Sequence, residues 1–190
     1  MVIKTVMNFS TSDLLPRDQF DAWRSVMAPV IDLELVGQKS KGFDAELDVW
    51  NLGGMTLTRA IMPGAVSPRR WRHLTRDPMD HWCLVLAHAG DPAKTGSGPG
   101  KRYLGFRSLA RPFEGFADDT HVLTLFIPRD LFGGDASAFD LVEGELPDTG
   151  VGGLVADYLL MLEKRLPMVD VDRWPSIVAA TRSLIAACLI

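Results

Sequence analysis

The residue that most strongly suggests binding chemistry in this sequence is Arg59, because it interrupts the otherwise apolar segment Met55–Met62. A cation that faces the interior of a protein needs an anionic or hydrogen-bonding partner, since burying an unpaired charge is costly. Aromatic side chains on other predicted strands would supply flat apolar walls. We therefore predict a pocket for a modest organic ligand with an acidic or polar end. Its predicted lining is Arg59, Trp82, His88, Phe106 and Phe126.

The direction in which each predicted strand faces leaves this pocket open to two other interpretations. Successive side chains of a strand point to opposite faces, so the predicted residues could face away from the pocket. In that case His81 and Trp71 would line it instead. If Arg59 faces solvent, the aromatic residues are ordinary core, because the inward residues of a small barrel can simply fill it.

The sequence lacks the residue spacings of a catalytic or metal site. His81 and His88 are an odd number of residues apart, so on one unbroken strand they point to opposite faces. A metal-dependent cupin would need a close His-x-His pair with a following Glu, which this sequence lacks. Cys83 and Cys188 are far apart, and the glycine-rich stretches match neither a phosphate loop nor a nucleophile elbow. We predict no catalytic residue, no metal ligand and no cofactor.

The overall charge disfavours nucleic-acid binding by this segment. The net charge is −4 and there is no long run of Lys or Arg, whereas phosphate neutralisation requires a concentrated basic patch. The cluster Arg69–Arg72 is followed by Asp77 and Asp80, which favours a solvated strand end or loop. The sequence contains neither a signal peptide nor an apolar stretch of membrane-spanning length, so we expect a cytoplasmic protein.

The hydrophobic pattern predicts one helix, then a group of strands, then two helices. The first helix begins near Pro16 and ends by Pro29. Strands grouped together with turns between them favour an antiparallel sandwich or small barrel with helices at its edge, which is an α+β fold. The predicted strands are 43–49, 55–62, 81–88, 101–109 and 121–128.

Two apolar helices are predicted at Gly152–Leu166 and Pro175–Ile190. The first is apolar around more of its circumference than one small core requires, and the second carries small residues that allow close helix approach. We therefore predict a homodimer that these helices mediate; the alternative is that both helices pack within one subunit. The predicted interface residues are Leu154, Tyr158, Leu159, Leu162 and Ile185.

The final helix is apolar up to Ile190 and has no capping Gly or Asn after it. This pattern favours a chain that continues beyond residue 190 and covers the helix. The alternative is a natural terminal helix packed on its own core.

Several segments, taken in order, resemble the amino-terminal sensor domain of AraC-type bacterial transcription regulators. The opening Phe9–Arg24 is similar to the entry helix of that family, with its Phe-Asp-Ala-Trp signature at Phe20–Trp23. Asp80-His81-Trp82 followed by an apolar strand resembles the start of the central strand. Arg111–Glu114 and Leu125–Leu131 resemble later barrel strands and the Pro-Arg turn that follows them.

The resemblance implies a cupin-like β-barrel or sandwich that binds a small organic effector and carries a helical dimerisation segment. It divides the chain into a sensor at 1–148 and a dimerisation segment at 149–190, with helix-turn-helix units expected after residue 190 to read promoter DNA. One departure is that the family's Pro-Gly-Asp turn is replaced here by Leu104–Ala110.

Three functions from different classes remain open at this point. The first is the ligand-sensing and dimerisation domain of a transcription regulator, without its DNA-binding part. The second is a cupin-type enzyme, which the missing metal triad disfavours. The third is a dimerisation module that binds no ligand.

Overall fold

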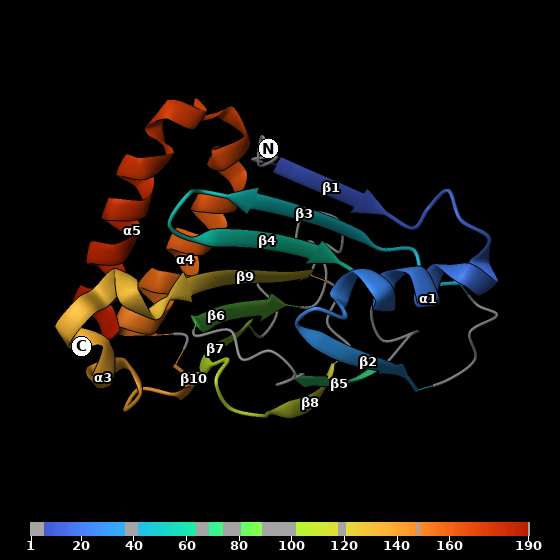
Figure 1. Cartoon of the computed structure of the whole chain (residues 1–190), viewed down its shortest axis with the longest axis horizontal. Coiled ribbons are helices and arrows are strands. Elements are labelled where there is room, and N and C mark those ends of the chain that lie inside the picture. Colours follow the sequence, from blue (N-terminus) through green and yellow to red (C-terminus); the bar gives the residue numbers. More distant parts are fainter. Residues whose placement is uncertain are drawn as a thin grey trace.

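The computed structural model describes residues 6–36, 42–63, 69–73, 81–88, 102–117, 121–147 and 149–189. It confirms the predicted α+β class, with an antiparallel sheet, an amino-terminal helix and a carboxyl-terminal helical pair (Figure 1). The sheets do not join into a closed barrel within the described ranges, so the architecture is that of a cupin-like sandwich.

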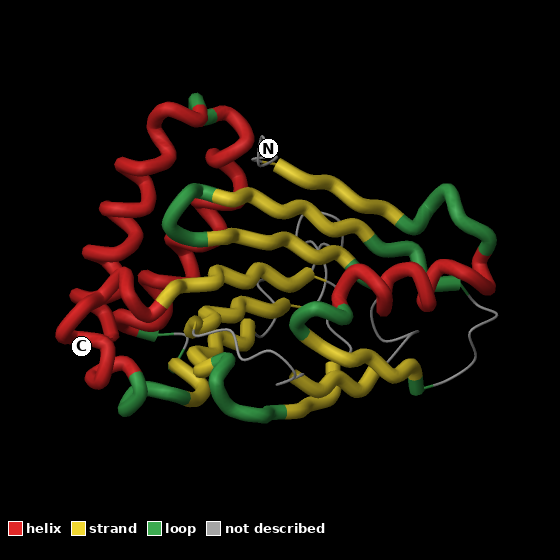
Figure 2. Tube along the Cα trace, in the orientation of Figure 1, coloured by secondary structure: helices red, strands yellow, loops and turns green. Residues whose placement is uncertain are grey.

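The large sheet has seven strands in the order β1-β3-β4-β9-β6-β7-β10, and every neighbouring pair is antiparallel. The second sheet has three strands in the order β2-β5-β8 (Figure 2). The bounds of the large sheet are β1 Val6–Ser10, β3 Glu46–Asn51, β4 Thr56–Ile61, β6 His81–His88, β7 Arg102–Ser108, β9 His121–Pro128 and β10 Gly144–Leu146. Those of the small sheet are β2 Ile31–Leu35, β5 Arg69–His73 and β8 Glu114–Ala117.

Helix α1 spans Pro16–Met27, as its Pro at the first turn and its apolar face predict. After β9 the chain forms the short helices η2 (Arg129–Asp135) and α3 (Ala136–Phe139), then β10. Helices α4 (Gly150–Arg165) and α5 (Trp174–Leu189) follow, with the single turns η3 (Leu166–Met168) and η4 (Val171–Arg173) between them.

The two faces of the large sheet are covered by different elements. Because side chains alternate along a strand, Leu84 and Leu86 of β6 face the same way as Leu123 and Leu125 of β9. These residues form one buried cluster with residues of α4 and α5, such as Leu159. We call this side of the sheet the helix face.

The opposite side of the large sheet faces the small sheet, and we call it the inter-sheet face. A second buried cluster lies here, built from α1 (Phe20, Trp23), from the segment before β3 (Phe43), and from β2 (Leu33). The edge-on contact of Phe20 with Phe43, at 5.2 Å between ring centroids, is typical of well-packed aromatic pairs. The α1 end of the space between the sheets is therefore filled by side chains.

One sequence interpretation is corrected by the small sheet. The segment Arg69–Arg72, expected to be a solvated strand end or loop, forms most of strand β5, where it pairs with β2 and β8. Arg69 is only 1% exposed, and its Nη1 donates to the carbonyl of Pro63. The sequence pattern hid this strand because its outward residues, Arg70 and Arg72, are charged.

Candidate functional site

The five residues predicted to line a pocket do not lie on one face of the sheet. Trp82 and Phe106 are on the helix face, 1% and 0% exposed, and their ring centroids are 6.1 Å apart. Trp82 also contacts Phe132 and Phe139, whose rings lie at 6.0 and 5.1 Å. These aromatic side chains form the core under η2 and α3, where their own subunit covers them.

Arg59 is also on the helix face, where it points toward α4 rather than between the sheets. Its guanidinium forms an ion pair with Asp48 and lies 4.0 Å from Glu163 of α4. Glu163 in turn lies 2.9 Å from Nε2 of His121. The anionic partner predicted for Arg59 is therefore not a ligand but the carboxylates of Asp48 and Glu163.

Phe126, by contrast, is on the inter-sheet face, because Leu125 and Ile127 on either side of it belong to the helix-face cluster. The two alternative pocket residues also lie on this side. Trp71 packs against the cluster between the sheets, and His81 points away from the helix face because it precedes Trp82 on the same strand. The side chain of His88 lies outside the described residues.

The inter-sheet face is less completely covered than the helix face. On β9 the burial alternates, so that Leu123 and Leu125 are buried whereas Thr124 and Phe126 are only half-buried. Val85 on the central strand β6 is half-buried too. We therefore take this face as the candidate site; among its residues on β4, β6, β7 and β9 are Thr58, His81, Cys83, Val85, Tyr103, Arg107, Thr124 and Phe126.

Two of these residues carry polar groups that sequence reasoning missed. Arg107 and Tyr103 lie on β7, and Nη2 of Arg107 donates a hydrogen bond of 3.3 Å to the hydroxyl of Tyr103. The Arg107 guanidinium also lies over the ring of Phe113, at 5.8 Å from its centroid. The sequence could have shown this, because alternate residues of a strand share a face and Arg102–Ser108 therefore puts Tyr103, Gly105 and Arg107 together.

The titratable groups near this face differ in what they can do. Burial raises the pKa of the Cys83 thiol to about 12, which makes it unreactive at neutral pH. Burial lowers the pKa of His73, whose ring stacks on Phe113 with centroids 4.8 Å apart. His81 differs from both, because its Nδ1 atom is buried and has no hydrogen-bond partner among the described residues.

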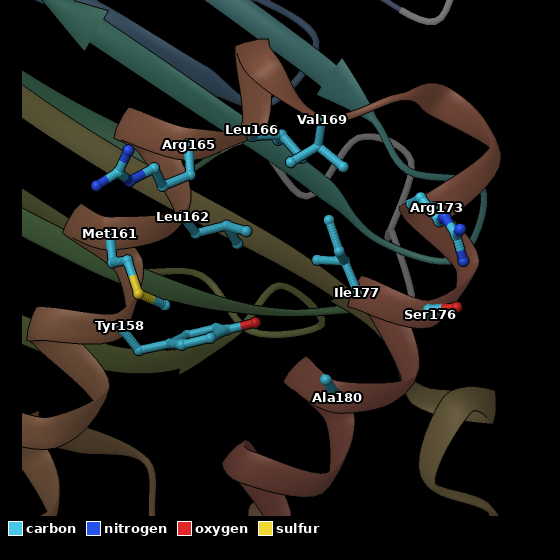
Figure 3. A pocket seen from close by; sticks show the side chains of 10 residues that line it. All are labelled: Tyr158, Met161, Leu162, Arg165, Leu166, Val169, Arg173, Ser176, Ile177 and Ala180. Atoms are coloured by element: carbon cyan, nitrogen blue, oxygen red, sulfur yellow. The ribbon is translucent and has the colours of Figure 1, made fainter.

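A separate groove of about 320 Å³ lies between α4 and α5. Figure 3 shows Tyr158, Met161 and Leu162 of α4 on one side and Ile177 and Ala180 of α5 on the other. The hydroxyl groups of Tyr158 and the buried Thr181 lie 2.6 Å apart, which fixes the spacing of the two helices. The groove is therefore an apolar surface held open by a defined helix pair.

The residues predicted for the dimer interface divide into surface and core. Leu154 is 53% exposed, and Tyr158 and Leu162 line the groove. Leu159 and Ile185 are each 1% exposed and pack against the large sheet, so their own subunit covers them. Met161, which the prediction did not name, is 53% exposed and lines the groove.

No set of three or more His, Cys, Asp or Glu side chains in the described ranges is arranged to hold a metal ion. Among the helices of those ranges, none is long and apolar enough to cross a membrane.

Comparison with known proteins gives one informative match. No family model matches the sequence, and no curated protein matches it. The crystal structure of the AraC-like transcriptional activator CuxR is similar, with a TM-score of 0.77 and 28% sequence identity. The match covers 96% of this chain and 70% of that chain. The resemblance to AraC-type regulators is confirmed.

The AraC-type similarity extends over the sandwich and the helical pair together, because it covers nearly the whole chain. At the point where the sequence departs from the family pattern, Leu104–Ala110, the chain completes β7 and turns at Leu109–Ala110. Arg107 lies in this segment, so the departure coincides with the cation of the inter-sheet face.

Proposed function

We propose that this chain is the ligand-sensing and dimerisation domain of an AraC-type transcription regulator. The observation that carries the proposal is the asymmetry of the large sheet. The apolar residues of β6 and β9 on its helix face, such as Leu84 and Leu125, are buried under α4 and α5, while its inter-sheet face leaves Val85, Thr124 and Phe126 half-buried. A small organic effector would bind the second face, and a second copy of the chain would bind α4 and α5.

The sensor at 1–148 and the dimerisation segment at 149–190 remain our proposed division. The proposal assigns promoter binding to helix-turn-helix units outside these residues, and it places the protein in the cytoplasm. For residues 1–190 alone we expect no tight, sequence-specific binding to a promoter fragment at physiological salt. Such binding would contradict this assignment.

Effector binding is tested by a thermal-shift screen of small organic compounds against the wild type and Val85→Trp. A ligand that binds only the folded state raises its stability by mass action. We expect at least one compound to raise the Tm of the wild type but not that of Val85→Trp, since the indole would fill the inter-sheet face. Stabilisation that persists in folded Val85→Trp would place the ligand elsewhere.

Dimerisation is tested by sedimentation equilibrium of the wild type and of Leu154→Lys/Met161→Lys. Both side chains are more than half exposed, so the substitutions leave the subunit core intact. We expect a dimer for the wild type and a folded monomer for the double variant. Leu141→Lys is the matched control, since Leu141 is 89% exposed and belongs to the turn between α3 and β10 rather than to either helix.

Two other functions make different predictions. A cupin-type enzyme that uses a metal would retain about one equivalent of iron, manganese or zinc after gentle purification, and metal analysis would reveal it. A dimerisation module without a ligand would dimerise normally but give no hit in the screen. The similarity to a transcription regulator supports the sensor over the enzyme.

A further inference from the structure

We propose that the effector is a small organic acid whose carboxylate or phosphate group binds Arg107. This inference rests on the proposed function and adds the chemical class of the ligand. It replaces Arg59, which the sequence suggested as the ligand-binding cation, with an arginine on the opposite face of the same sheet.

The first argument is charge balance. The other half-buried arginines of the large sheet and its flank each have a carboxylate partner, namely Asp48 for Arg59, Asp157 for Arg102 and Asp140 for Arg129. No carboxylate of the described residues lies within ion-pairing distance of Arg107. A half-buried cation that forms no ion pair within the described part of the chain favours an anion at this position.

The second argument is orientation. A Cβ atom on Gly105 would lie 2.5 Å from the hydroxyl oxygen of Tyr103, so the Tyr103 side chain lies directly over this glycine. That position lets the hydroxyl accept a hydrogen bond from Arg107, while the ring of Phe113 lies against the guanidinium. The hydrogen bond to Tyr103 uses one of the five N–H donors of the guanidinium. A planar fork held in place in this way matches a carboxylate or a phosphate.

The third argument is the surroundings of Arg107. Arg107 lies opposite Cys83, which lies opposite Phe126, so these residues form one row across three strands. Neighbouring strands are about 4.8 Å apart, which puts the backbones of Arg107 and Phe126 roughly 10 Å apart. A compound with one acid group and one ring spans that distance, with its apolar body along Val85 and Phe126.

A second polar group lies close to the same position. His81 is two residues before Cys83, on the same face of β6, and is therefore a diagonal neighbour of Arg107. Its buried Nδ1 atom has no hydrogen-bond partner within the described part of the chain. A polar substituent of the ligand would supply that partner.

The test is isothermal titration calorimetry with benzoate, phenyl phosphate and the neutral isostere benzamide. The variants are Arg107→Gln, Arg107→Lys and Val85→Trp, with Arg70→Gln as the matched control because Arg70 is exposed on β5. We expect at least one acid to bind the wild type more tightly than benzamide does. Arg107→Gln should weaken that binding by about tenfold or more, as expected for a hydrogen-bonded charge pair.

The variants separate this inference from the proposed function. Arg107→Lys should retain part of the affinity because it keeps the charge, and Arg70→Gln should retain all of it. If benzamide binds as well as the acids and only Val85→Trp abolishes binding, the acid class is wrong but the inter-sheet site stands. If binding survives in Val85→Trp, the inter-sheet site itself is wrong. If neither acid binds the wild type, the inference is overturned.

Discussion

Asp140 joins two elements at one end of the large sheet. Its carboxylate accepts a hydrogen bond of 3.0 Å from the indole N–H of Trp82, and both of its oxygens accept from Nη1 of Arg129, at 2.9 and 3.0 Å. The Arg129 guanidinium also lies 4.4 Å from the centroid of the Trp82 ring. These contacts hold the start of η2 and the end of α3 against the sheet.

We predict that Asp140 makes stability depend on pH. Burial by itself would raise the pKa of Asp140, but the hydrogen bonds from Trp82 and Arg129 and the charge of Arg129 lower it below its usual range. A lowered folded-state pKa gives stability that is present above about pH 4 and is lost as the pH falls through the folded-state pKa.

The measurement is urea unfolding of the wild type and Asp140→Asn between pH 7 and pH 3. We expect Asp140→Asn to lower the free energy of unfolding by about 1–2 kcal/mol at pH 7, with the difference shrinking at the acid end. The exposed Asp130→Asn is the control and should change stability by less than about 0.5 kcal/mol. A difference between wild type and Asp140→Asn that is constant with pH would contradict this role.

At the residue scale, the residues predicted to line one pocket divide between the two faces of the large sheet, with Arg59, Trp82 and Phe106 on one face and Phe126 on the other. Arg59 did need an anionic partner, and the structure supplies Asp48 and Glu163. The sequence of β6 could not show which of its residues face the helices, because a strand that is covered on both faces is apolar on both. The sequence did not single out Arg107, because β7 carries two arginines, Arg102 and Arg107, that lie on opposite faces of the strand.

At the element scale, long elements with a clear period were predictable and short ones were not. Helix α1, the strands β4, β6, β7 and β9, and helices α4 and α5 lie within a few residues of their expected positions. Strands β1, β2, β5 and β10 were not predicted, and β8 was expected only from the family resemblance at Arg111–Glu114, because these strands have three to five residues and depend on their neighbours for pairing. The helix bounds were predictable because Pro16 and Pro175 mark first turns.

Helix α4 offers a matched pair of substitutions that distinguishes its two sides. Leu159 is 1% exposed and packs on the sheet, whereas Leu154 is 53% exposed. We expect Leu159→Ala to lower the free energy of unfolding by about 2–5 kcal/mol, because it leaves a cavity in the core. Leu154→Ala should cost less than about 0.5 kcal/mol when unfolding is measured at a concentration where the protein is monomeric. Equal losses would show that the burial of α4 differs from this description.

Gly152 lies where α4 passes the end of β10, and we predict that Ala is harmful there. A Cβ atom on Gly152 would lie 2.0 Å from the carbonyl oxygen of Pro147, which is backbone and cannot swing aside. In an exposed helix interior, Gly→Ala stabilises by about 1 kcal/mol. Here we expect Gly152→Ala to destabilise by about 1–3 kcal/mol in thermal unfolding, because the helix must shift. A rise in the Tm would contradict the close approach.

At the scale of the whole molecule, the sequence predicted the sandwich and the helical pair but not how the core is divided. The largest apolar side chains of the sheet pack against α3, α4 and α5, so the deepest core lies under the helices. That division depends on which face of the sheet the helices cover. This is set by the tertiary structure and cannot be read from the hydrophobic pattern of any one segment. It also explains why Trp82 and Phe106, two of the aromatic residues expected to line a pocket, are core residues, whereas Phe126 lies on the less buried inter-sheet face.

The central claim is that this chain is a sensor domain that brings two copies of a regulator together. The most direct measurement fuses the chain to a DNA-binding domain that represses a reporter only as a dimer. We predict strong repression by the wild-type fusion and by Leu141→Lys, and loss of repression by Leu154→Lys/Met161→Lys at equal protein level. A folded wild-type fusion that represses no better than the DNA-binding domain alone would contradict the account.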